Sequence, residues 1–172
     1  MNNTNYLPPV APSRTYSDYL GGLRKFWIAP REWLNGFPDV DPTTQVLAAE
    51  PTLLAGRDWM GPIDVSSEMM GYEEVSTPSP AGVFYKRKFS FLETGLAVSN
   101  HINIGNLMGY EFCVVGLVRS GAYFIVCGND KTGMKLDTNE GTGIGPLGMP
   151  MTKLALTDES AEKAIVLPSF SH

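Results

Sequence analysis

The stretch 109–137, GYEFCVVGLVRSGAYFIVCGNDKTGMKLD, decides the fold that the rest of the chain follows. Two apolar runs, Glu111 to Val118 and Ala122 to Cys127, are rich in β-branched and aromatic residues. Between them, Ser120-Gly121 supplies a residue that accepts positive φ, which predicts a β-hairpin with a tight turn. Because the runs are nearly continuous rather than alternating, we expect both faces of this hairpin to be covered.

Further strands are predicted on both sides of this hairpin. They are Leu23 to Ala29, Ile63 to Ser67, Val83 to Phe91, Met134 to Asp137, Met151 to Thr157 and Lys163 to Leu167. The run from Val83 alternates most clearly: Val83, Tyr85, Phe89 and Phe91 share one face with Arg87, while Phe84, Lys86, Lys88 and Ser90 share the other.

The connections contain turn residues and few helix signals. Glu73 to Pro80 contains Thr77-Pro78-Ser79-Pro80 and is interpreted as a loop that projects from the body. Arg31 to Leu34 could make one helical turn, and Thr94 to Leu107 favours a short helix. The acidic pair Asp158-Glu159 is placed in a turn between two strands.

The predicted fold class is mainly β, a single-domain β-sandwich or barrel with at most one or two short helices and an extended N-terminal arm. Residues 1–20 form the N-terminal arm and residues 21–172 the β domain, since 172 residues suffice for one core and no internal boundary appears. In the N-terminal arm, three prolines prevent a helix. Tyr6, Tyr16 and Tyr19 favour a segment laid on a neighbouring molecule over a loose tail.

Composition excludes several classes of protein. The net charge of −5 argues against a protein that grips nucleic acid by its phosphates, while leaving room for a surface along which DNA slides. Charged residues make up only 18% of the chain, which is typical of a surface partly covered by partner subunits. No apolar run approaches the roughly 20 residues of a membrane span, and we expect neither a secretion signal nor contact with a membrane.

The two cysteines, Cys113 and Cys127, lie on the two arms of the central hairpin. If the turn is centred on Ser120 they face each other, and a cross-strand disulfide is geometrically thinkable. The favoured interpretation is two reduced, buried side chains that behave as small hydrophobes.

No pattern in the sequence supports catalysis or a bound cofactor. Gly143-Ile144-Gly145-Pro146-Leu147-Gly148 matches a dinucleotide-binding string, but prolines occupy the place where the required helix would begin. With His101 and His172 as the only histidines, no spacing typical of a metal site occurs. We therefore predict no enzyme activity, no catalytic residues, no cofactor and no metal.

The layout of residues 23–168 resembles bacteriophage tail structural proteins of the tail-tube and tail-terminator-like family, Bacteroidetes phage type. In the N-terminal half the resemblance rests on Lys25 to Pro30, Asp41 to Thr44 and Leu54 to Trp59. In the second half it rests on Phe112 to Val118, Tyr123 to Gly128, Met134 to Leu136, Gly141 to Gly143 and Leu154 to Thr157.

This resemblance implies a virion protein, assembled in the host bacterial cytoplasm, that forms stacked rings of β-barrels with DNA passing through the lumen. The partners it implies are further copies in a sixfold homo-oligomer and other tail or neck proteins, with no sequence-specific DNA binding. It also implies an inter-subunit sheet and an arm or long hairpin that reaches the next ring. The assembly interface is predicted at Tyr6, Leu7, Tyr16, Tyr19, Phe112, Val114, Phe124 and Val126.

Two other functions stay open at this point. One is a capsid decoration or other head-associated virion protein. The other is a monomeric ligand- or carbohydrate-binding β-sandwich module, with Trp27, Trp33 or Trp59 as a stacking surface. Core packing is the favoured interpretation for each of these tryptophans.

Overall fold

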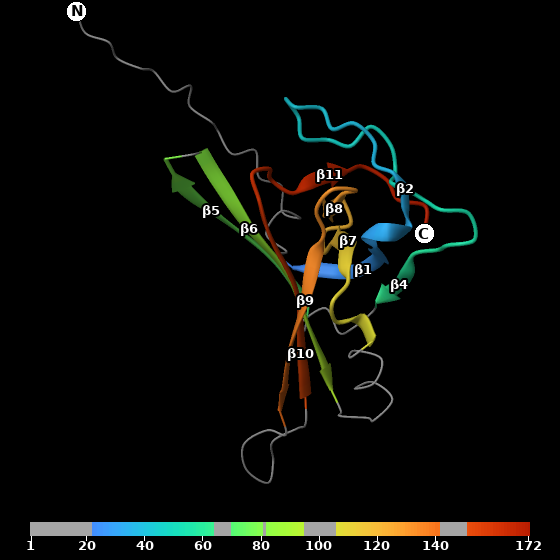
Figure 1. Cartoon of the computed structure of the whole chain (residues 1–172), viewed down its shortest axis with the longest axis vertical. Helices are drawn as coiled ribbons and strands as arrows, with labels where there is room; N and C mark the ends of the chain where they lie inside the picture. Colours follow the sequence, from blue (N-terminus) through green and yellow to red (C-terminus); the bar gives the residue numbers. More distant parts are fainter. Residues whose placement is uncertain (1–21, 64–69, 81, 95–105, 142–150) are drawn as a thin grey trace, which may run out of the picture.

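Strands dominate the computed structural model, which describes residues 22–63, 70–80, 82–94, 106–141 and 151–172. The predicted fold class is confirmed, because the chain is mainly β around a large antiparallel sheet (Figure 1). The strands are β1 (Leu23–Pro30), β2 (Leu34–Gly36), β3 (Thr52–Leu53), β4 (Met60–Ile63), β5 (Met70–Ser79), β6 (Gly82–Thr94), β7 (Glu111–Val118), β8 (Phe124–Cys127), β9 (Met134–Gly141), β10 (Met151–Ser160) and β11 (Ile165–Leu167). A 3-10 turn over Arg31–Trp33 matches the helical turn predicted for Arg31 to Leu34.

Strand β7 is the centre of the sheet. The strand order is β11-β8-β7-β9-β10-β6-β5, and β1 pairs with β7 and carries β4 beyond it. One edge of β7 binds β8 over Val114–Leu117 and then β9 at Glu111 and Phe112, while β1 pairs along nearly the whole strand. The near-continuous apolar pattern of this stretch follows from that position, because neither face nor either edge of β7 meets water over most of its length.

Two hydrophobic cores lie on opposite faces of the β1–β7–β8 part of the sheet. One contains Phe112 and Val114 of β7 together with Phe26 of β1 and Phe89 of β6, and it fills the space against the β5–β6–β10–β9 part. The other contains Cys113, Val115, Trp27, Trp59 and Phe170, and it is covered by the segment after β1 and by the C-terminal residues. Alternate side chains of β7 therefore enter different cores, as the two-residue repeat of a strand requires.

A glycine-bounded loop turns the chain from β8 into β9. Gly128 has a φ of +82°, and a Cβ built on it would lie 2.5 Å from the carbonyl oxygen of Phe112. At Gly133 a Cβ would lie 2.7 Å from the Cβ of Glu111. The loop therefore crosses directly over the start of β7, and this close approach places β8 and β9 along the same edge of that strand.

The structure corrects two sequence predictions. Glu73 to Pro80 is not a loop, because β5 runs through Ser79 and pairs with β6 at every position. Asp158 and Glu159 do not lie in a turn, since β10 continues to Ser160. Of the strand predicted over Ile63 to Ser67, only Ile63 is described, as the last residue of β4, and residues 64–67 lie outside the described residues. Most of the predicted helix between Thr94 and Leu107, the glycine-rich string and the N-terminal arm lie outside the described residues.

The central hairpin also differs from its predicted register. Val114 faces Cys127 and Leu117 faces Phe124, so the turn is centred half a residue beyond Ser120. A shift of one residue in pairing moves a side chain to the other face of the sheet. Cys113 and Cys127 accordingly lie in different cores, both as free thiols, and the geometry considered for a disulfide does not exist.

Candidate assembly interface

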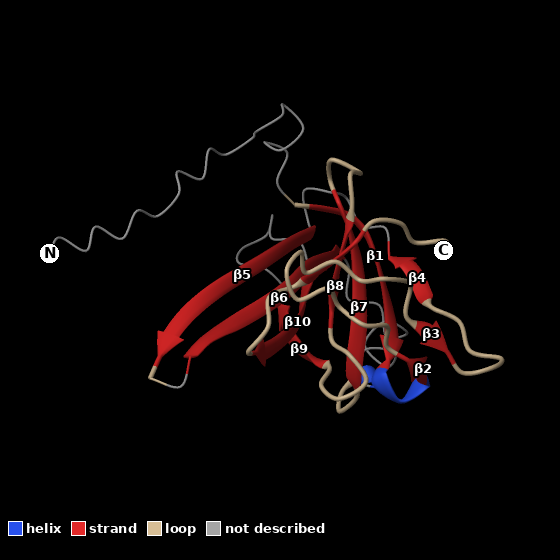
Figure 2. Ribbon diagram, turned by 90° about the horizontal axis from the view of Figure 1, so that it is seen from above, coloured by secondary structure: helices blue, strands red, loops and turns tan. Residues whose placement is uncertain are grey.

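Strands β5 and β6 form a long hairpin whose outer part extends beyond the body of the molecule (Figure 2). Their pairing runs without a bulge from Met70 opposite Phe91 to Ser79 opposite Gly82. We call residues 75–80 and 82–85 the arm, and residues 70–74 and 86–91 its root. The root is covered by the first core, whereas most of the arm is exposed on both faces.

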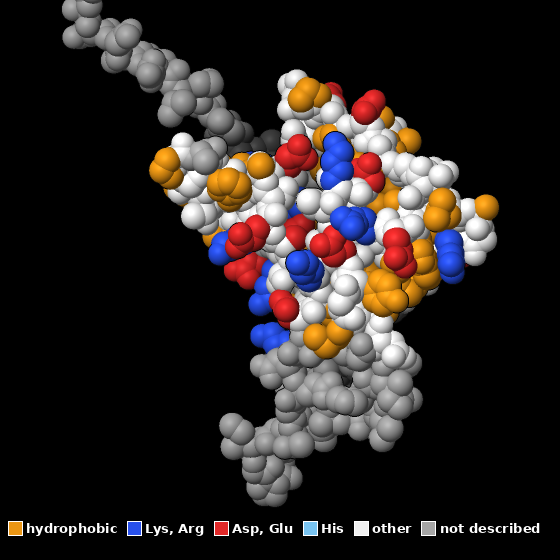
Figure 3. Space-filling model, viewed as in Figure 1, with side chains coloured by type: hydrophobic (Ala, Val, Ile, Leu, Met, Phe, Trp, Pro, Cys, Tyr) orange, Lys and Arg blue, Asp and Glu red, His pale blue; other side chains and the backbone are white. Residues whose placement is uncertain are grey.

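The arm carries three exposed large hydrophobic side chains. Val75, Val83 and Phe84 have 48, 45 and 41% of their surface exposed. Val75 and Phe84 lie on the face that also carries Lys86, and Val83 lies on the opposite face with Tyr85. Hydrophobic side chains gather over the arm in the space-filling view (Figure 3). Exposed apolar surface on a projecting element is typical of a site that contacts another molecule.

The outer edge of β5 has no strand partner among the described residues. Within the described part of the chain β5 pairs only with β6 and ends the strand order of the sheet. Edge strands in soluble proteins are usually shortened, charged or bulged, which discourages pairing with another chain. β5 carries Glu73 and Glu74, but it is neither short nor bulged. Its edge is regular over the eight residues 70–77, and only Pro78, near the tip, lacks a backbone donor.

A buried ion pair fixes the root of the arm to β10. Arg87 and Asp158 lie opposite each other on neighbouring strands, and their side chains are only 4 and 7% exposed. The guanidinium donates from Nε to Oδ1 of Asp158 at 2.8 Å and from Nη2 to Oδ2, which makes the contact bidentate. Burial by itself would lower the pKa of Arg87, but the bonds and charges around the side chain outweigh that cost and raise it. Arg87 therefore stays charged.

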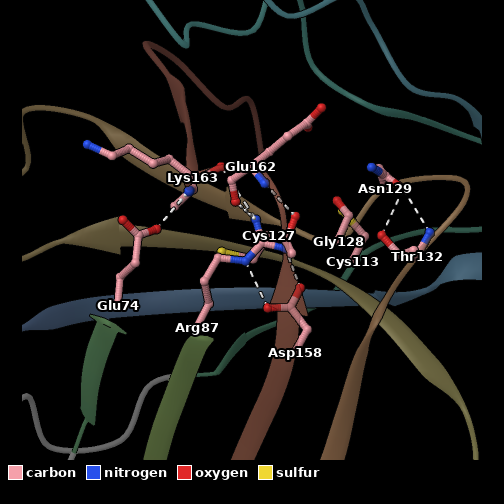
Figure 4. Close-up of polar contacts among 12 residues, drawn as sticks. Glu74, Arg87, Cys113, Cys127, Gly128, Asn129, Thr132, Asp158, Glu162 and Lys163 are labelled. Atoms are coloured by element: carbon pink, nitrogen blue, oxygen red, sulfur yellow. Dashed lines mark hydrogen bonds and ion pairs between the residues drawn. The ribbon is translucent and has the colours of Figure 1, made fainter. Parts of the chain in front are cut away.

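The same root holds the segment that leads from β10 to β11 (Figure 4). Arg87 Nη1 lies 3.5 Å from the carbonyl oxygens of Glu162 and Lys163. On the neighbouring strand, Glu74 Oε2 accepts from the N–H of Ala164 at 2.8 Å and from the hydroxyl of Tyr72 at 2.9 Å. Two strands of the hairpin thus bind one segment of the body, and this network couples the direction of the arm to the position of β11.

Buried thiols beside this network make stability depend on pH. Burial raises the pKa of Cys127 from 9.0 to about 12, and it raises the pKa of Cys113 as well. Below pH 9 both states keep these protons. As pH rises from 9 towards 12, the unfolded thiols ionise while the folded thiols do not, so the unfolded state gains stability.

We expect the free energy of unfolding to fall by about 1.4 kcal/mol per pH unit for each such thiol in this window. Urea unfolding at pH 8, below the window, and at pH 10 and 11, within it, measures this slope, and Cys127→Ala should make it shallower. An unchanged slope in Cys127→Ala would show that this thiol is not the titrating group. The comparison uses only the slopes of the free energy of unfolding against pH, so a lower stability of Cys127→Ala at pH 8 does not affect it.

The structure places three of the predicted interface residues, Phe112, Val114 and Val126, inside the subunit. These three side chains have 0% of their surface exposed, whereas Phe124 is half-buried and packs against Trp27 and Phe170 at ring distances of 6.0 and 5.7 Å. Side chains without exposed surface cannot contact a neighbouring subunit. Their apolar character comes from the two cores of this chain. Tyr6, Leu7, Tyr16 and Tyr19 lie outside the described residues.

The arm itself was missed as a strand pair, although one signal was available. The alternation in the sequence places Phe84 on the same face as Lys86 and Lys88, opposite the face that carries Phe89. A large aromatic residue on the lysine face is a sign of surface that meets something other than water.

Two of the three tryptophans belong to the core, as the favoured interpretation expected. Trp27 and Trp59 are 4 and 7% exposed and each packs edge-on against Phe170. Trp33 is half-buried, and the guanidinium of Arg57 covers its ring at 4.8 Å.

The described residues contain no group of three histidine, cysteine or acidic side chains that could hold a metal ion. Among the same residues, no helix has the length and apolarity needed to cross a membrane. No family model, no curated protein and no solved structure matches this chain.

Proposed function

We propose that this chain is a virion structural protein, a phage tail tube or neck ring subunit that assembles with copies of itself into a ring, sixfold by resemblance, around a passage for DNA. The observation that supports this best is the arm. It carries Val75, Val83 and Phe84 exposed on a hairpin whose outer edge pairs with no other strand that the structure describes. In a monomer this surface costs solubility, whereas in an assembly it is buried by a neighbour.

The charge of the chain is compatible with the same function. A net charge of −5 disfavours lasting contacts with DNA phosphates, which suits the wall of a conduit. In this function the arm takes the place of Phe112, Val114, Phe124 and Val126 as the assembly surface. A capsid decoration protein would use the arm in the same way, and electron microscopy of the assembled particle separates the two.

The arm gives the first test of assembly. We expect the wild-type chain to form oligomers whose mass rises with concentration, and Phe84→Lys to remain a monomer of 18.7 kDa. A lysine at this position keeps the strand but places a charge in a contact that excludes water. Size-exclusion chromatography with light scattering measures the mass, and negative-stain images should show rings or tubes for the wild type alone.

The matched control is Tyr110→Lys. Tyr110 is a comparably exposed aromatic side chain, 44% against 41% for Phe84, and it lies off the arm. This variant should assemble like the wild type. A wild-type chain that stays monomeric at all concentrations would refute assembly, and equal losses in both variants would refute the role of the arm.

A further inference from the structure

A second surface feature lies beside the root of the arm, on the face of the sheet that points away from the first core. It is a cleft of about 680 Å³ that crosses β5, β6, β10 and β9 and ends at the loop around Thr132 and Gly133. Its size falls within the range of sites that bind small molecules or short peptide segments. Side chains from all four strands enter it because paired residues on neighbouring strands share a face.

Most charges in the cleft have a partner within the chain. Lys86 binds Glu159 at 2.9 Å, and Glu111 lies 3.0 Å from the guanidinium of Arg31. Asp137 accepts a hydrogen bond from the hydroxyl of Thr157 at 2.9 Å. Arg87 and Asp158 point to the opposite face, where they bind each other.

Two lysines in the cleft differ from these paired side chains, because they form no ion pair with a described residue. Lys88 and Lys135 both lie opposite Thr157, one on each neighbouring strand, and neither makes an ion pair with any described residue. Side chains opposite one another on an antiparallel sheet are about 5 Å apart, so the two lysines stand about 10 Å apart with Thr157 between them. Their long side chains can converge on one anionic group above that threonine.

The acidic residues nearby restrict what this anion can be. Glu73 lies opposite Lys88, and Asp137 lies two residues along β9 from Lys135 on the same face. These acids repel a polyanion such as nucleic acid, but they favour a cation next to the bound anion. The spacing from Lys135 to Asp137 is that of residues i and i+2 in a strand, about 6.7 Å. An extended peptide presents its own side chains at that spacing.

We infer that this cleft binds an extended peptide segment of a partner protein with an acidic and a basic residue two positions apart. The acidic side chain lies between Lys88 and Lys135, and the basic side chain reaches Asp137. This site goes beyond self-assembly, since it is complete within one copy of the chain.

The probe is the blocked peptide acetyl-Ala-Glu-Ala-Lys-Ala-amide, titrated into the full chain by isothermal titration calorimetry. We expect saturable binding that weakens about tenfold in Lys88→Met and in Lys135→Met, because each removes a charge-assisted hydrogen bond. The matched control is Lys86→Met, which removes the same charge from the same cleft but lies outside the group formed by Lys88, Thr157 and Lys135. It should shift the dissociation constant by less than about twofold. Circular dichroism confirms that each variant is folded.

Two peptides in which glutamine replaces either the glutamate or the lysine should each bind about tenfold more weakly. Inorganic phosphate should compete poorly, since it supplies no group for Asp137. The inference is overturned by the absence of binding up to about 5 mM, by equal effects of Lys86→Met and Lys88→Met, or by phosphate that competes as well as the peptide. Monomeric Phe84→Lys should bind the peptide like the wild type, so the result does not depend on assembly.

Discussion

Arg87→Met is expected to lower the free energy of unfolding by about 3–5 kcal/mol, which is the usual cost of breaking a buried ion pair by removing one partner. The side chain of Asp158 would remain at 7% exposure without its counter-charge, and the carbonyls of Glu162 and Lys163 would lose their donor. Such a loss is a large fraction of the stability of an ordinary domain. Urea unfolding followed by tryptophan fluorescence measures it.

Two further variants isolate the cause. Lys86→Met removes a pair between the same two strands one position away, but Lys86 and Glu159 are 64 and 66% exposed, so a cost of at most about 1 kcal/mol is expected. The double variant Arg87→Met/Asp158→Leu removes both buried charges and should recover more than half of the loss. If Lys86→Met and Arg87→Met lower the free energy of unfolding equally, burial of the Arg87–Asp158 pair is not the cause of the loss.

Gly128→Ala should cost about 2–5 kcal/mol, for two separate reasons. The residue has a φ of +82°, a conformation that costs an L-amino acid about 1–2 kcal/mol. The added Cβ would also lie 2.5 Å from the carbonyl oxygen of Phe112 and 3.1 Å from the Cα of Cys113. Both atoms belong to the backbone of the central strand, which cannot move aside without disturbing its pairing, and overpacking of this kind costs about 1–3 kcal/mol.

Gly121→Ala separates these two terms. Gly121 has a φ of +73° in the turn between β7 and β8, and nothing lies within 4 Å of a Cβ built there. This variant should therefore cost about 1–2 kcal/mol, from the backbone conformation alone. Urea unfolding of both variants gives the difference, and equal costs would mean that the loop moves away from β7 without loss.

The strands with strong local patterns were predictable from the sequence. The bounds of β7 follow from a run of β-branched and aromatic residues, and the two faces of β6 follow from its alternation, with Arg87 on the apolar face. That arginine also held a further clue, because a charge on a buried face requires a buried partner. Its partner Asp158 lies 71 residues away, and only the pairing of β6 with β10 identifies it.

Other features depended on contacts that a single sequence does not contain. Pro78 and Pro80 are turn residues by local rules, and only the continuous pairing with β6 makes 70–79 a strand. The register of the central hairpin depends on a shift of half a residue in the centre of its turn, which local sequence does not determine. The cleft requires the alignment of three strands before Lys88 and Lys135 are seen on either side of Thr157.

The position of β7 has a consequence for how the molecule unfolds. Its side chains enter both cores in turn, and it pairs with β1, β8 and β9. Because β7 supplies side chains to both cores, it cannot leave its place without opening both. The two cores are therefore thermodynamically linked through one strand. We expect the domain to unfold in a single cooperative transition and not by successive local openings.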